Sequence, residues 1–156
     1  MSAKPTVSDM KAGRPVFHII NAGGNYMIVR KPTILYYDNG QEEKRKSMEK
    51  SISHMGIRFI PIMPAHFLQT VGHLAKIKGF PAKKTPPLAN LPEITEDILI
   101  MCHFTEEKLD EFLNSMRTGT IPKVSLKAVL TAQNCFWTFA QLFQELTEER
   151  DNFYSE

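Results

Sequence analysis

The stretch from Asp97 to Met116 reads Asp-Ile-Leu-Ile-Met-Cys-His-Phe-Thr-Glu-Glu-Lys-Leu-Asp-Glu-Phe-Leu-Asn-Ser-Met, and it decides the fold. Its first six residues form a mainly apolar run that is typical of a buried strand. Thr105 then has the side chain of a helix N-cap, and the two glutamates after it favour the positive end of a helix dipole. Apolar side chains recur at Leu109, Phe112 and Met116, a spacing that predicts one buried helix face. We therefore expect a strand followed by a helix.

The same pattern occurs earlier in the chain. Residues 33–37 (Thr-Ile-Leu-Tyr-Tyr) predict a short strand. Asn39 and Glu42 have the spacing of a capping box, and a helix is expected to run to about Met55, just before Gly56. An offset of 64 residues aligns two pairs of runs, Ile34-Leu35 with Ile98-Leu99 and Glu42-Glu43-Lys44 with Glu106-Glu107-Lys108. The sequence therefore predicts two successive βαβα units, which we interpret as an internal repeat that arose by duplication.

The remaining elements complete the two units. Residues 57–63 predict a strand, and its Pro61 cannot donate a ladder hydrogen bond, which favours an edge of the sheet or a bulge. A helix is expected over 65–77, a strand over 124–130, and a further helix after Asn134, which would be its N-cap. Each strand–helix–strand passage should give parallel strands. The expected fold class is therefore α/β, with one mostly parallel sheet covered by helices.

The segments outside these units are polar or rich in turn residues. Two short apolar runs flank Asn21-Ala-Gly-Gly-Asn25, and this pattern predicts an N-terminal β-hairpin within residues 14–31. Residues 1–13 are expected to be a disordered tail. The rest is expected to be a single α/β domain, with these parts: the whole domain at 14–156, the first unit at about 33–77, a proline-rich linker at 78–96 and the second unit at about 97–150.

The composition is that of a globular protein, with 42% hydrophobic and 23% charged residues. Cys102 and Cys135 form no CxxC pair, which favours a reducing compartment over a disulfide framework. No apolar run approaches the ~20 residues that a transmembrane helix needs. Residues 1–13 also lack the apolar segment of a signal peptide. These observations predict a cytoplasmic protein with no membrane partner.

Charge is distributed unevenly, which the formal net charge of +2 conceals. Residues 1–90 hold 14 Lys and Arg against 5 Asp and Glu, whereas residues 91–156 hold 5 against 12. A basic first half could meet an anionic partner such as RNA. Alternatively, it could lie against the acidic half, within one fold or across a homodimer. Residues 42–50 mix lysines and an arginine with glutamates, as on a solvated helix face, which favours the second interpretation.

Polar residues follow the expected strands, and ligands collect beyond the carboxyl ends of strands in parallel sheets. We therefore expect four segments at one rim: 38–39, 64–66, 103–105 and 131–134. Thr131 and Asn134 would form a small polar pocket with Lys127, above the indole of Trp137. The alternative is that Asn134 is a helix cap, Thr131 ends a strand and Trp137 is a core residue. The candidate ligand-binding residues are Asn39, His66, Lys127, Thr131, Asn134 and Trp137.

No catalytic residue, metal site or cofactor is predicted. His66 and His73 share a helix face in the expected helix, but no third ligand stands at metal-binding spacing. Cys102 and His103 are neighbours on a strand, where adjacent side chains point to opposite faces, so they are poorly placed to share a proton. The sequence therefore favours a non-enzymatic ligand-binding or protein-interaction module, whose partner is a second copy of the chain or another protein. The alternative is an RNA- or anion-binding protein that uses the basic first half.

Part of the second unit resembles a known family pattern. The matching residues are Leu109, Leu113, Gly119, Lys127, Thr131, Asn134, Trp137, Glu145, Glu148 and Glu149. On these residues the chain resembles a bacterial family catalogued as domain of unknown function 3783. The resemblance is good over residues 94–150 and weaker over 34–80, and Ala132 stands where a proline is expected in many members. It implies a small bacterial cytoplasmic protein and assigns no activity, substrate or catalytic residue.

Overall fold

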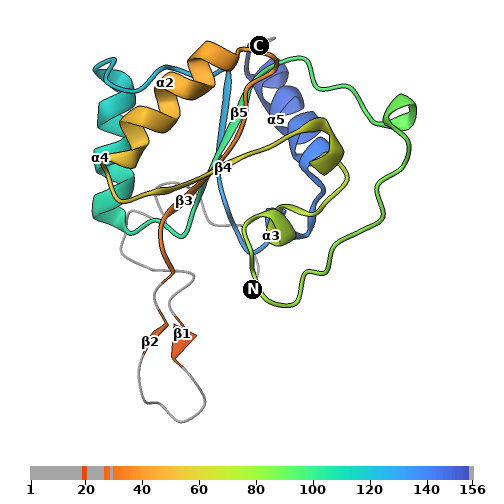
Figure 1. Ribbon diagram of the computed structural model, residues 1–156, viewed down its shortest axis with the longest axis horizontal. Coiled ribbons are helices and arrows are strands. Elements are labelled where there is room, and N and C mark those ends of the chain that lie inside the picture. Colours follow the sequence, from red (N-terminus) through yellow and green to blue (C-terminus); the bar gives the residue numbers. More distant parts are fainter. Residues whose placement is uncertain (1–18, 21–26, 29, 155–156) are drawn as a thin grey trace.

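A computed structural model describes residues 19–20, 27–28 and 30–154 of the chain (Figure 1). The expected tail at 1–13 and the expected turn at 21–25 lie outside these described residues. Strand β1 (Ile19–Ile20) pairs antiparallel with β2 (Met27–Ile28), as in the predicted hairpin.

The main sheet has four strands in the order β4-β3-β5-β6. These are β3 (Thr33–Tyr37), β4 (Arg58–Pro61), β5 (Ile98–Cys102) and β6 (Leu126–Val129). β3 pairs parallel with β4, β5 pairs parallel with β6, and the central pair β3–β5 is antiparallel. The mostly parallel α/β sheet is therefore confirmed, and Pro61 lies in an edge strand, as its missing N–H group predicts.

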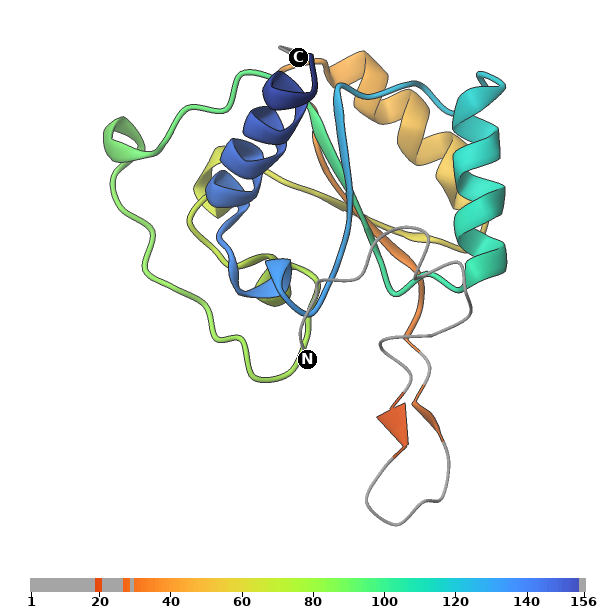
Figure 2. The same cartoon turned by 180° about the vertical axis from the view of Figure 1, so that it is seen from behind.

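Helices cover both faces of this sheet. α2 (Glu42–Ser53) and α4 (Glu106–Arg117) lie side by side on one face, whereas the short α3 (Val71–Leu74) and the long α5 (Phe139–Tyr154) lie on the other (Figures 1 and 2). No helix in the described part of the chain is long and apolar enough to cross a membrane.

Alternate strand residues fill two separate cores. Ile34 and Tyr36 of β3 pack with α2 and α4, whereas Leu35 between them packs with α3 and α5. β5 alternates in the same way, with Leu99 in the first core and Ile100 in the second. Each βαβα unit thus contributes one helix to each core.

The two units are arranged around an approximate two-fold axis between β3 and β5, because both outer pairs are parallel and the central pair is antiparallel. The expected offset of 64 residues holds for the helices, which begin at Glu42 and Glu106. It is wrong by one residue for the strands, since Ile34 and Ile98 belong to different cores. The loop at 38–41 is one residue longer than the loop at 103–105, which accounts for the change. Duplication of an ancestral unit stays a prediction.

The helix expected over 65–77 is wrong. The 3₁₀ helix η1 (Pro64–His66) and the short α3 take its place, and the backbone between them is extended at Thr70. Thr70 forms an isolated antiparallel bridge with Thr138. The Phe139 N–H donates to the Gln69 carbonyl at 3.0 Å, and the Val71 N–H donates to the Trp137 carbonyl at 2.8 Å. Pairing with the second unit therefore replaces the helical hydrogen bonds that the apolar spacing predicted.

Two of the three expected helix caps are also wrong. The Thr105 hydroxyl accepts from the Lys108 N–H at 3.1 Å and caps α4, as expected. Asn39 does not cap α2, because Gln41 precedes that helix and Asn39 adopts a left-handed φ of 51° in the loop before it. Asn134 begins the 3₁₀ helix η3 (Asn134–Phe136), and α5 starts after Thr138, whose hydroxyl accepts from the Gln141 N–H.

Residues 78–96 connect the two units. They run outside α5 in both views of the molecule and include the 3₁₀ helix η2 (Leu88–Asn90) (Figures 1 and 2). The connector begins with a sharp turn, in which Gly79 has a φ of 96° that favours glycine.

Candidate functional site

The expected polar segments do not share one rim. β3 and β5 are antiparallel, so their carboxyl ends lie at opposite edges of the sheet. We call the edge where β3 and β4 end the Tyr37 edge, and the edge where β5 and β6 end the Cys102 edge. Asn39 and His66 follow β3 and β4, whereas Thr131, Asn134 and Trp137 follow β6. The single-rim expectation is wrong because it assumed that all four strands run in the same direction.

Thr131 and Asn134 form a closed turn at the Cys102 edge. The Thr131 N–H donates to Asn134 Oδ1 and the Asn134 N–H donates to Thr131 Oγ1, both at 2.9 Å. Asn134 Nδ2 also donates to the Val129 carbonyl at 3.0 Å. The two residues are only 4% and 6% exposed. Their polar side-chain atoms are thus engaged within the turn.

Lys127 and Trp137, the other two residues of the expected pocket, lie on either side of this turn in the sequence. Lys127 is exposed on β6 between Leu126 and Ala128, which both belong to the α3–α5 core. Alternation along a strand therefore directs Lys127 to the opposite side of the sheet. Trp137 is half-buried against the α3–α5 core. The structure thus brings Thr131 and Asn134 together, and the Trp137 N–H donates to the Asn134 carbonyl at 3.0 Å, whereas Lys127 stands exposed on β6.

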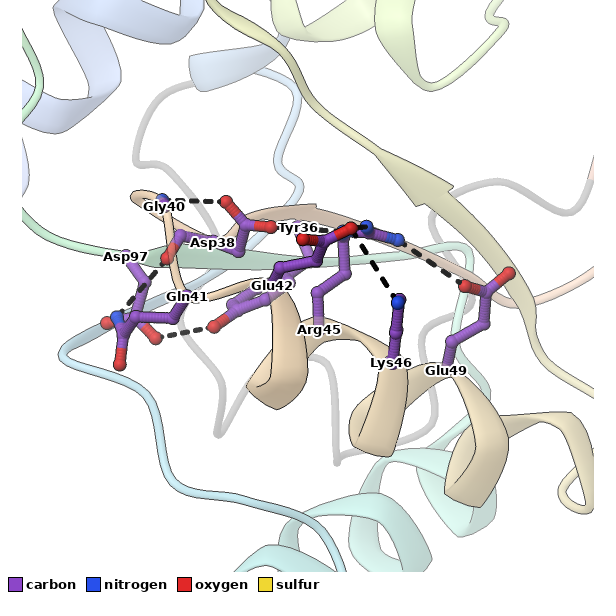
Figure 3. Close-up of polar contacts among 9 residues, drawn as sticks. All are labelled: Tyr36, Asp38, Gly40, Gln41, Glu42, Arg45, Lys46, Glu49 and Asp97. Atoms are coloured by element: carbon purple, nitrogen blue, oxygen red, sulfur yellow. Dashed lines mark hydrogen bonds and ion pairs between the residues drawn. The ribbon is translucent and has the colours of Figure 1, made fainter.

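At the Tyr37 edge, Asp97 is the centre of a buried polar network, drawn in part in Figure 3. Its carboxylate is 1% exposed and accepts from Tyr36 Oη at 2.7 Å, Lys44 Nζ at 2.8 Å and the Ser125 N–H at 2.9 Å. Burial acts to raise the pKa of Asp97, but the hydrogen bonds from Lys44, Tyr36 and Ser125 outweigh it and leave the pKa below its ordinary value. Burial, followed by the bond to Asp97, raises the pKa of Tyr36.

The basic residues of α2 are balanced by neighbouring carboxylates. Arg45 lies 3.0 Å from Asp38 and within 4 Å of Glu42 and Glu49, in the cluster that Figure 3 shows. Lys44 of the basic half pairs with Asp97 of the acidic half. The excess of positive charge in the first half is therefore partly neutralised within the chain. Other cations of the first half lie beside the end of α3.

An open cavity of about 540 Å³ lies beside the end of α3. Its lining residues are Arg30, His73, Lys76, Ile77, Lys78, Gly79, Phe80 and Pro81, and no carboxylate is among these described residues. We call it the basic cavity. Arg30 is thus brought beside Lys76 and Lys78, which come from a distant part of the sequence. Sequence reasoning missed this cavity, and its only signal was the excess of Lys and Arg before residue 90.

Hydrogen bonds of Arg30 and His103 connect the segment that lines the basic cavity to the Cys102 edge of the sheet. Arg30 Nη1 donates to the Lys76 carbonyl at 3.2 Å, and the buried Arg30 Nε has no hydrogen-bond partner within the described residues. His103 Nε2 lies 3.2 Å from the Ala75 carbonyl. Burial lowers the pKa of His103 and, with the charges of Arg30 and Arg58, outweighs the hydrogen bond to Ala75, which acts to raise it. This wall of the cavity is therefore held by long-range polar contacts.

Lys76 and His103 have left-handed φ angles of 64° and 63°. Such angles cost non-glycine residues energy, and they persist where surrounding contacts enforce them, often at functional sites. The two residues are close in space, because His103 Nε2 contacts the carbonyl of Ala75, which directly precedes Lys76. The backbone at the cavity is thus held in an unfavourable conformation.

Gly72 of α3 allows the close packing behind the cavity. A Cβ atom added at Gly72 would lie 2.7 Å from Phe80 Cγ and 2.9 Å from the Cys135 carbonyl oxygen. The Cys135 contact involves backbone, so it cannot be relieved by a rotamer change. Gly72 therefore brings α3 close to both Phe80 and η3.

We expect Gly72→Ala to lower the free energy of unfolding by about 1–3 kcal/mol because it overpacks this contact. Helix propensity alone would favour alanine by about 1 kcal/mol. The matched control is Ala140→Gly. Ala140 follows Thr138 by two residues, as Gly72 follows Thr70, and this change should lower the free energy of unfolding by only about 1 kcal/mol. Urea unfolding measures both, and a Gly72→Ala variant more stable than the wild type would contradict the close contact.

The fold and its cavity define an α/β protein of two βαβα units with a basic cavity beside the sheet. Residues 97–153 match the family model described as Domain of unknown function (DUF3783). The match runs from Asp97 through β5, α4 and β6 into α5, and it confirms the resemblance expected from the sequence. Comparison with curated proteins found no match, and neither did comparison with solved structures.

Proposed function

We propose that the protein is a binding module for an anionic ligand, which it holds in the basic cavity. The observation that carries this proposal is the gathering of Arg30, Lys76 and Lys78 around about 540 Å³ without a carboxylate among the described lining residues. That volume is in the range of small-molecule binding sites. The proposal unites the two functions expected from the sequence, a ligand-binding module and a basic first half that attracts an anion.

The contrast with α2 supports this choice of ligand. Arg45 is surrounded by carboxylates, whereas Arg30 donates to a backbone carbonyl, and its buried Nε has no partner within the described residues. A guanidinium group presents several N–H donors in one plane, which matches the geometry of a phosphate or carboxylate. An anion in the cavity would reduce the repulsion between the three cations.

The two cysteines fit a reducing compartment, which we propose is the bacterial cytoplasm, and they are not suited to act as nucleophiles. Both are buried free thiols. Burial raises the pKa of Cys102 and of Cys135. A reactive cysteine needs the opposite shift, because the thiolate is the nucleophile.

Inorganic pyrophosphate provides a direct test of anion binding. We expect the wild-type protein to bind it in a calorimetric titration at low ionic strength, with affinity falling as salt is added. The double variant Lys76→Gln/Lys78→Gln should bind about tenfold more weakly or worse, because two nearby charges are lost.

The matched control is Lys46→Gln/Lys50→Gln, which removes the same charge from α2 and should leave the affinity nearly unchanged. Equal weakening in both variants would indicate diffuse attraction to the whole surface and would overturn the cavity assignment. Absence of pyrophosphate binding at millimolar concentration would overturn the proposed function itself.

A further inference from the structure

An exposed aromatic ring stands next to the basic cavity. Phe136, the last residue of η3, is 69% exposed. Its ring centroid lies 5.0 Å from that of Phe80, at an interplanar angle of 55°. Phe80 lines the cavity, so one residue joins the exposed ring to the cationic space. Most of the surface of this ring is therefore open to contact by a ligand.

From this juxtaposition we infer that the anionic ligand is a nucleotide, with its phosphate in the basic cavity and its base stacked on Phe136. The inference rests on the proposed function and deepens it by naming the ligand class. Aromatic side chains beside cations are the recurring means by which proteins hold unpaired nucleotides, because every base has a π-face and every phosphate a charge. A cavity of about 540 Å³ is of the size that accommodates one small ligand.

The backbone that carries this ring is held by the turn before it. The reciprocal bonds between Thr131 and Asn134 fix the start of η3, and Asn134 is also bonded to the Val129 carbonyl. On the other side, Gly72 lets α3 approach the Cys135 carbonyl, directly before Phe136. A backbone fixed in this way has little conformational freedom left to lose when a ligand stacks on Phe136.

The test compares three ligands that separate the base from the phosphate: adenosine monophosphate, ribose 5-phosphate and adenosine. We expect the monophosphate to bind more tightly than either of the other two. Phe136→Leu should weaken binding of the monophosphate about tenfold, the size of one stacking interaction, and leave ribose 5-phosphate binding unchanged. Phe136→Tyr keeps an aromatic face and should retain the wild-type affinity. Lys76→Gln/Lys78→Gln should weaken both phosphorylated ligands.

The outcomes separate this inference from the proposed function. If ribose 5-phosphate binds as tightly as the monophosphate and Phe136→Leu changes neither, the nucleotide assignment is overturned while anion binding stands. If none of the phosphorylated ligands binds, both fall. Phe136 is largely exposed, so the variants should fold, and circular dichroism verifies this. A single-stranded oligoadenylate then identifies the source: tighter binding than the monophosphate indicates RNA, and equal binding per nucleotide indicates a free nucleotide.

Discussion

Asp97→Ala is expected to lower the free energy of unfolding by about 3–5 kcal/mol, because it removes the buried partner of an ion pair and the acceptor of two further hydrogen bonds. The variant leaves the Lys44 ammonium group, the Tyr36 hydroxyl and the Ser125 N–H without their acceptor. Tyr36 is completely buried, so its hydroxyl has no access to water in exchange. Urea unfolding followed by circular dichroism measures the loss.

Asp38→Ala is the matched control, because Asp38 is also an ion-paired aspartate at the Tyr37 edge but its side chain is 19% exposed. Its removal should cost about 1 kcal/mol or less. Tyr36→Phe removes one of the hydrogen bonds to Asp97 and should cost about 1 kcal/mol. If Asp97→Ala costs no more than Asp38→Ala, the buried network does not stabilise the fold as described.

The difference in stability between the wild type and Asp97→Ala should depend on pH in a defined way. Burial opposes ionisation of Asp97, but its three donors outweigh burial, so its pKa in the folded protein lies below the ordinary value. A depressed pKa stabilises the folded state fully above the unfolded-state value of about 3.9, and this contribution is lost as the pH falls through the folded-state pKa. The stability difference between wild type and Asp97→Ala should therefore be constant near neutral pH and shrink below about pH 4.

Elements with strong local signals could be predicted from the sequence. The apolar runs at 33–37 and 98–102 are strands, and the Thr105 cap begins α4, because these signals depend on neighbouring residues alone. The direction of β5 relative to β3 could not be predicted, since an apolar strand reads the same whichever way its partner runs. The prediction of a helix over 65–77 was wrong for a related reason. The Thr70–Thr138 bridge joins residues of different units, and a local sequence pattern cannot predict such a contact.

The candidate site shows the same limit. The three-residue spacing of Thr131 and Asn134 was visible in the sequence, but it fits both a helix cap and the closed turn that the structure contains. Arg30 and Lys76 are 46 positions apart and meet only because α3 returns to the edge where β3 begins. The uneven charge of the two halves indicated that cations were available. It could not indicate which of these cations would pair with carboxylates, as on α2, and which would line a cavity.

Phe139→Ala is expected to lower the free energy of unfolding by about 3–5 kcal/mol, as large-to-small changes at buried aromatic residues do. Phe139 is fully buried, and its ring stacks on Phe67 of the first unit at a centroid distance of 6.0 Å. Its N–H donates to the Gln69 carbonyl, also in the first unit. The matched control on the same helix is Phe153→Ala. The Phe153 side chain is 74% exposed, so this variant should change the free energy of unfolding by no more than about 0.5 kcal/mol.

The same variant tests whether the two units form one domain. The first unit has only the short α3 on the face where the second has α5, and Phe67 packs against Phe139 of the second unit as well as Tyr37 of its own. We therefore expect Phe139→Ala to weaken both units in one cooperative transition. Fluorescence of Trp137, the single tryptophan, reports on the second unit, and hydrogen exchange of the β3–β4 amides reports on the first. Midpoints that separate, with β3–β4 protection retained after the Trp137 signal is lost, would show that the units unfold independently and would contradict a single domain.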